Sequence, residues 1–153
     1  MTRSRFSIAC VVFALSACGG PEESPETRIR SLISEVEEAA EARDISVISG
    51  VVSDEYRDGR GYDRQAVLRI VQGIFLRNRE IHLLSVVREL QVNASSGRAR
   101  VLVAMAGQPI ESADALIKVR AELIRFDVDF ALEGEEWLVR AVEWERANVK
   151  DFL

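Results

Sequence analysis

A change of hydrophobic period at Ile81 constrains the fold of this 153-residue chain more than any other feature. Before Ile81, apolar residues recur every three or four positions, which is the spacing of one face of a helix. After it, apolar and polar residues alternate, as they do in half-buried strands. Helices followed by a run of antiparallel strands are typical of an α+β domain whose helices cover one face of a sheet.

The first half of the chain predicts helices. Either Pro25 or Thr27 begins the first one, and residues 44–52 predict a short second helix or a turn. The loop at 53–62 is rich in Gly and Asp, and Asp63 after it is a suitable N-cap for a further helix. The two long apolar stripes are Ile29, Leu32, Ile33, Val36, Ala39 and Ala40, and then Ala66, Val67, Ile70, Val71, Ile74 and Phe75.

The second half predicts about four antiparallel strands, at 81–92, 98–105, 124–132 and 137–146. Residues 93–97 and 133–136 form the two hairpin turns, and a long connection with a helical turn at 112–119 joins the middle strands. The last residues of the chain are expected to be a loosely held tail at 148–153. The folded domain would therefore span 27–147.

Three stretches resemble the nuclear-transport-factor-2-like (cystatin-like) superfamily. They are the loop SDEYRDGRGYDR before a helix, the strand RARVLVAMAG, and the last strand GEEWLVRAVEWERA, with Trp137 just after a hairpin turn. The resemblance covers about Thr27 to Arg146. It implies that the helices pack on a curved sheet and leave a cone whose mouth can hold a small apolar ligand. The superfamily includes ketosteroid isomerases, polyketide cyclases, binding domains and dimerisation modules, so the fold alone does not imply one function.

The N-terminus predicts export and lipid attachment. Met1–Arg5 is basic, and the uncharged apolar run Phe6–Ser16 is too short to span a bilayer but typical of a secretory signal. Leu15-Ser16-Ala17-Cys18 resembles the lipobox of bacterial lipoproteins, which implies a signal peptide at 1–17, a lipid on Cys18 and a flexible tether at 18–26. The alternative is an ordinary secretory signal that is cut near Ala17, with no modification of Cys18.

The residue after the lipobox indicates whether a lipoprotein stays in the inner membrane or is sorted to the outer membrane. In enterobacterial sorting rules an Asp at that position favours the inner membrane, so Gly19 favours the outer membrane, with the domain facing the periplasm. Cys10 would leave with the signal and Cys18 would carry lipid, so no thiol is expected to serve in a disulfide, a metal site or catalysis.

The charge of the domain excludes some partners. Loss of Arg3 and Arg5 with the signal lowers the net charge from −5 to −7. An acidic domain without a basic stripe does not suit nucleic acid or an anionic lipid surface. Membrane contact is therefore expected to come from the lipid on Cys18.

Three residues are candidates for chemistry in the cone. His82, the single histidine, could act as a general base if it lines the cone, or it could be a strand-end histidine bonded to backbone or water. Tyr56 beside Asp54 could bind a ligand carbonyl; alternatively Tyr56 packs in the core while Asp54 and Asp58 bind turn amides. No residue matches the isomerase catalytic set, and no metal or cofactor motif is present in the sequence.

Charged residues on neighbouring strands predict cross-strand ion pairs, with a paired-carboxylate site as the alternative. These residues are Arg98, Arg100, Arg125, Asp127, Asp129, Glu143 and Glu145.

The leading hypothesis for function is a non-catalytic binding or interaction module. It would form a homodimer, or meet another envelope protein, through the sheet face that carries Arg125, Asp127 and Trp137. The alternative is a small isomerase- or cyclase-like enzyme acting on an apolar ligand in the cone. A cone filled by Phe75, Met105 and Phe126 would exclude the enzyme, and an open cavity containing His82 or a carboxylate would favour it.

Replacing Cys18 tests the anchor. Cys18→Ser should abolish lipidation and move the protein from the membrane pellet to the soluble fraction, because two or more acyl chains are needed for stable attachment. Immunoblotting of fractionated cells measures the change. Cys10→Ser is the matched control, and it should leave the protein in the membrane. Unchanged membrane retention of Cys18→Ser would contradict the lipoprotein prediction.

Overall fold

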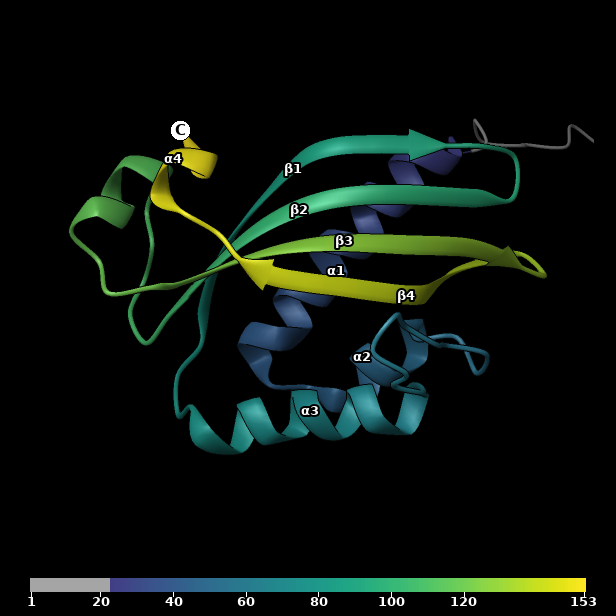
Figure 1. Cartoon of the computed structure of the whole chain (residues 1–153), viewed down its shortest axis with the longest axis horizontal. Helices are drawn as coiled ribbons and strands as arrows, with labels where there is room; N and C mark the ends of the chain where they lie inside the picture. The colour runs from purple at the N-terminus through teal and green to yellow at the C-terminus, as the bar shows by residue number, and fades with distance from the viewer. Residues whose placement is uncertain (1–22) are drawn as a thin grey trace, which may run out of the picture.

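The computed structural model describes residues 23–153, and its elements confirm the predicted α+β class (Figure 1). The predicted signal peptide, Cys18 and most of the predicted tether lie outside the described residues. The elements are α1 (Pro25–Ala42), α2 (Ile45–Val51), α3 (Arg64–Arg77), β1 (His82–Val92), β2 (Ser96–Ala106), η1 (Ala113–Ile117), β3 (Glu122–Glu133), β4 (Glu136–Arg146) and α4 (Val149–Phe152).

The strands form one antiparallel sheet in the order β1-β2-β3-β4, and it is strongly curved (Figure 1). Neighbours in the sheet are also neighbours in the sequence, which is the simplest arrangement for consecutive hairpins. The β3–β4 turn closes between Glu133 and Glu136. Gly134 in this turn has φ 66°, a left-handed conformation that glycine adopts without steric cost.

Helix α1 crosses the concave face of the sheet and forms the core with it. Ser24 caps the helix by accepting a hydrogen bond from the Thr27 amide, so the helix begins at Pro25, one of the two predicted starts. Ile29 and Leu32 are fully buried. A Cβ on Gly97 of β2 would lie 2.6 Å from Cδ1 of Ile29, so any other residue at 97 would require the end of the Ile29 side chain to shift.

The convex face of the sheet is covered at one end by η1 and α4. Leu116 of η1 and Phe152 of α4 are buried against Leu102 and Ala104 of β2. The prediction that residues 148–153 are loosely held is therefore wrong. The alternating pattern could not reveal this cover, because β2 buries apolar residues on both faces.

Two details of strand packing differ from the predicted alternation. A bulge between Val87 and Glu89 changes the face that β1 presents, so Val86 packs with the η1–α4 cluster while Leu90 packs with the main core. Trp137 is 5% exposed and lies in the main core. The prediction that Trp137 shares a partner-binding sheet face with Arg125 and Asp127 is therefore wrong.

Helix α3 is held at its ends. At its start, the Arg64 guanidinium donates hydrogen bonds to the carbonyls of Ser49 and Val52, and Asp63 caps the helix. After its last turn, the carbonyl of Asn78 accepts a hydrogen bond from Arg43. None of the α3 side chains is buried, and the helix packs on α2 rather than on the strands (Figure 1).

Among the described helices, none is both long and apolar enough to cross a membrane.

The core can be tested with a pair of leucines. Leu32→Ala should lower the free energy of unfolding by about 2–5 kcal/mol, because it leaves a cavity in the α1–sheet interface. Leu76→Ala on the solvent side of α3, where the leucine is 88% exposed, should change it by less than about 0.5 kcal/mol. Urea denaturation followed by circular dichroism measures both. Equal losses would show that α1 does not form the main core.

Candidate ligand cavity

A cavity of about 920 Å³ lies between α3 and the concave face of the sheet. Ile70, Ile74 and Phe75 of α3 line one side, and Phe126 and Val128 of β3 line the other. All of these residues are only partly buried, since the two apolar surfaces face one another without meeting. A cavity of this size and composition is typical of small-molecule sites.

The cavity is open. Phe75, Met105 and Phe126, the three residues that could have filled the cone, form part of its wall instead. The condition set for excluding the enzyme, a cone filled by these three side chains, is therefore not met.

Tyr56 is the sequence candidate that reaches the cavity wall. Its side chain is buried, and its hydroxyl donates a hydrogen bond to Oδ2 of Asp58 at 3.2 Å. Oδ1 of Asp58 accepts from the amides of Arg60 and Tyr62, both at 2.9 Å. Burial, and then the Asp58 carboxylate, raise the pKa of the Tyr56 hydroxyl. Asp58 therefore binds turn amides and Tyr56 packs in the core, as the structural alternative predicted, but Asp54, which the same alternative assigned to turn amides, is exposed.

Asp54 and His82 are not part of the cavity wall. The Asp54 side chain is 96% exposed, and its carboxylate lies 3.4 Å from Nε of Arg64. His82 begins β1 and lies on the same face of the strand as Leu84 and Val86, which pack with the η1–α4 cluster on the side of the sheet away from the cavity. Neither Asp54 nor His82 therefore lies in the cavity wall with Tyr56. The condition under which His82 could act as a base, that it lines the cone, is not met.

The sequence did not single out Arg60, which lies at the edge of the cavity with Trp144. The guanidinium carbon is 4.1 Å from the centroid of the Trp144 ring, and Nη2 donates to the Trp144 carbonyl at 2.6 Å. The ring of Tyr62 stacks on the same indole at 6.2 Å between centroids. The one sequence feature that could have drawn attention to Arg60 is its position between two glycines, Gly59 and Gly61, in the loop. The structure adds that Asp58, which is buried, holds this loop.

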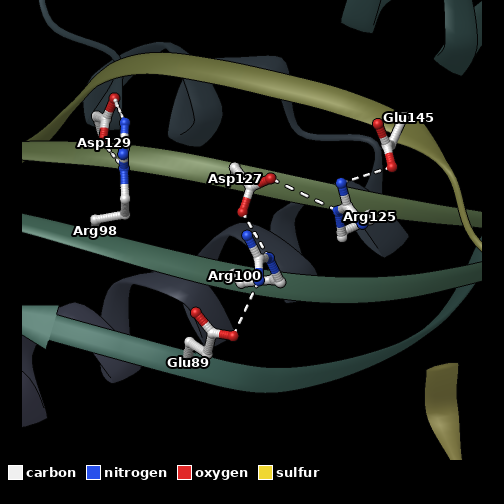
Figure 2. Close-up of polar contacts among 7 residues, drawn as sticks. All are labelled: Glu89, Arg98, Arg100, Arg125, Asp127, Asp129 and Glu145. Carbon is white, nitrogen blue, oxygen red and sulfur yellow. Dashed lines mark hydrogen bonds and ion pairs between the residues drawn. The ribbon is translucent and has the colours of Figure 1, made fainter.

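The predicted cross-strand ion pairs form on the convex face (Figure 2). Arg98 binds Asp129 at 2.7 Å, and Arg100 bridges Asp127 and Glu89, both at 2.9 Å. Arg125 extends the network to Glu145 at 2.6 Å. Asp127, Asp129 and Glu145 each contact an arginine, so the arrangement is that of ion pairs and not of a paired-carboxylate site. The fourth predicted carboxylate, Glu143, has no ion pair within residues 23–153. Within residues 23–153, no group of His, Cys, Asp and Glu is placed to hold a metal ion.

Comparison with known proteins identifies the fold. No protein-family model matches the sequence, and no curated protein is similar to it. Solved structures do match: Bd1075 of Bdellovibrio bacteriovorus has a TM-score of 0.64 at 9% identity, over 78% of this chain and 40% of that one. The chain thus spans less than half the length of Bd1075.

Two further matches cover most of both chains. A proposed dehydratase of the NTF2-like family from Streptomyces avermitilis has a TM-score of 0.61 at 13% identity, over 80% of this chain and 96% of that one. A domain of unknown function with a cystatin-like fold from Nostoc punctiforme has a TM-score of 0.59 at 18% identity, over 80% and 77%. This chain has the NTF2-like, cystatin-like fold. Identities this low show the fold and not the activity.

The role of the Tyr56 hydroxyl can be tested by its removal. Tyr56→Phe should lower the free energy of unfolding by about 1–3 kcal/mol, because it leaves a buried oxygen of Asp58 without its donor. Tyr62→Phe is the matched control in the same loop; Tyr62 is 36% exposed, so the change should be below about 0.5 kcal/mol. Urea denaturation compares the two variants. If both lose the same stability, the Tyr56–Asp58 contact does not hold the loop.

Proposed function

We infer that this chain is a lipid-anchored binding protein of the bacterial envelope, which holds a small apolar molecule between α3 and the sheet without transforming it. The open cavity of about 920 Å³ is the observation that carries this proposal. The anchor would be a lipid on Cys18, and the domain would face the periplasm from the outer membrane. The convex face with Arg125 and Asp127 is the surface we propose for a second copy or an envelope partner.

The places of Tyr56 and His82, the candidates for acid–base chemistry from the sequence, support binding over catalysis. Tyr56 is the sequence candidate in the wall, and its hydroxyl already donates to Asp58. A tyrosine whose pKa is raised by burial is a poor source of the tyrosinate that a general base would need. His82, the single histidine, belongs to a strand position facing away from the cavity.

The alternative is a small isomerase- or cyclase-like enzyme. The condition set for it is met in part, since the cavity is open and apolar and the carboxylates of Glu37 and Glu122 reach its wall together with Tyr56. Such an enzyme would use Tyr56 to donate a hydrogen bond to a ligand carbonyl, and this would require the hydroxyl to turn away from Asp58.

Native mass spectrometry of the full chain, purified from its own envelope in mild detergent, tests the proposal. We expect a mass increment beyond the lipid anchor, corresponding to a retained small molecule. Ile74→Glu places a charge on the cavity wall and should abolish the increment, because burying an unpaired carboxylate beside an apolar ligand is unfavourable. Leu76→Glu, two residues along the same helix and exposed, is the matched control and should retain it.

The two variants also separate binding from folding. Circular dichroism should give equal melting temperatures, since neither side chain is buried in the core. An increment that survives Ile74→Glu, or its absence from the wild-type protein together with a clean dimer, would contradict ligand binding in the cavity. A chemically altered molecule released on incubation would favour the enzyme.

A further inference from the structure

The charged groups at the cavity wall show what kind of ligand the cavity suits. Three arginines reach the wall, Arg60, Arg77 and Arg146. In the part of the chain that the structure describes, none of them has a carboxylate oxygen within 4.0 Å. The arginines of the convex face, in contrast, are each paired with an acid.

Arg60 is the most firmly positioned of the three. Its guanidinium lies 4.1 Å over the Trp144 ring, and one N–H group is taken by the Trp144 carbonyl at 2.6 Å. Asp58 fixes the backbone on both sides by accepting from the amides of Arg60 and Tyr62. A guanidinium has five N–H donors, so donors remain for a ligand after this contact.

Arg146 adds a second positive charge at the same edge. It lies two residues after Trp144 on β4, so the two side chains point to the same face about 7 Å apart. Arg77 is less suited to binding a ligand at this edge, because its side chain folds back along α3. Its Nη1 lies over Gly73, 3.3 Å from the position that a Cβ at residue 73 would occupy.

Two carboxylates also reach the wall without an ion pair among the described residues, Glu37 of α1 and Glu122 of β3. Neither is held by hydrogen bonds in the way that Arg60 is, and both come from elements other than the Arg60 loop. Asp58, close to Arg60, already accepts hydrogen bonds from Tyr56 and two backbone amides. Glu122 is a diagonal cross-strand neighbour of Arg146, since Ile124 pairs with Arg146. With both arginines and this one carboxylate counted, the edge formed by Arg60 and Arg146 keeps one unpaired positive charge in excess, and Arg60 is its firmly positioned member.

We propose that the ligand is an amphiphile with an apolar body and one anionic head group, and that Arg60, assisted by Arg146, binds the head. The apolar body occupies the space between Ile74 of α3 and Phe126 of β3. Charge-assisted hydrogen bonds from a planar guanidinium suit a carboxylate. This inference rests on the proposed function, since it requires that the cavity binds a small molecule.

Photo-crosslinking of the full lipidated chain in mild detergent tests the inference. The probes are dodecanoic acid, dodecanol and dodecylamine, each carrying the same diazirine, at a pH where the acid is ionised. Labelling is mapped to peptides of α3 and β3 and expressed as the ratio of acid to alcohol. We expect a ratio well above one, and Arg60→Gln should lower it about tenfold, as the loss of a charged hydrogen bond implies.

Two variants control this result. Arg57→Gln removes an exposed arginine of the same loop that does not line the cavity, and it should leave the ratio unchanged. Arg60→Lys keeps the charge but loses the planar donor pair, so it should restore part of the ratio. Labelling by the alcohol should be the same in all of these proteins, because the alcohol does not use the guanidinium.

The outcomes distinguish this inference from the proposed function. If no probe labels α3 or β3, the cavity does not bind such molecules and both fail. If acid and alcohol label equally in the wild type, or if Arg60→Gln weakens both to the same extent, the apolar site stands and the anionic head is wrong. Preferential labelling by the amine would assign the head group to Glu37 or Glu122 and overturn the inference in the same way.

Discussion

The contact between the Ile29 side chain and Gly97 anchors the helix layer on the sheet. Ile29 is fully buried, and the end of its side chain lies where a Cβ at position 97 of β2 would be. Leu32, Phe130 and Trp137 then pack around the same contact and form the main core at one end of the curved sheet. Because the core is concentrated there, the other end of the concave face has no helix packed directly on it.

This uneven packing produces the cavity. The apolar residues of β3 and α3 that would close a fully packed domain face each other across open space instead. Leaving so much apolar surface uncovered is unfavourable in water, since each Å² costs roughly 25 cal/mol. A ligand that covers this surface would recover part of that free energy, which is why an open apolar cavity indicates binding more strongly than any one polar residue in it.

Sequence periodicity was sufficient to predict the helices and strands, their order, and the ion pairs of the convex face. It was insufficient where one residue changes the face of a strand or where both faces are buried. The bulge near Arg88 moved Leu90 to the concave side, and the cover provided by Phe152 depends on contacts with Leu102 far away in the sequence. Alternation alone cannot reveal either effect.

The candidate site was harder to predict than the fold. Tyr56 was recognised as a residue of interest, but its partner is Asp58 and not Asp54, because Asp58 lies where the loop turns back and can reach both the hydroxyl and two amides. Arg60 was missed because its role depends on Trp144, which is brought to it only by the pairing of the loop with the edge of β4.

Helix α3 is attached to the rest of the domain by hydrogen bonds at its two ends. Arg64 makes them at the first turn, and Arg43 makes one after the last turn. Between these supports its side chains contact mainly solvent, α2 and the cavity. An element with few buried contacts opens at a lower free-energy cost than the sheet beneath it. Helix α3 can therefore change its distance from the sheet to accommodate ligands whose apolar parts differ in thickness. The more stable strands meanwhile keep the Arg60–Arg146 edge in place.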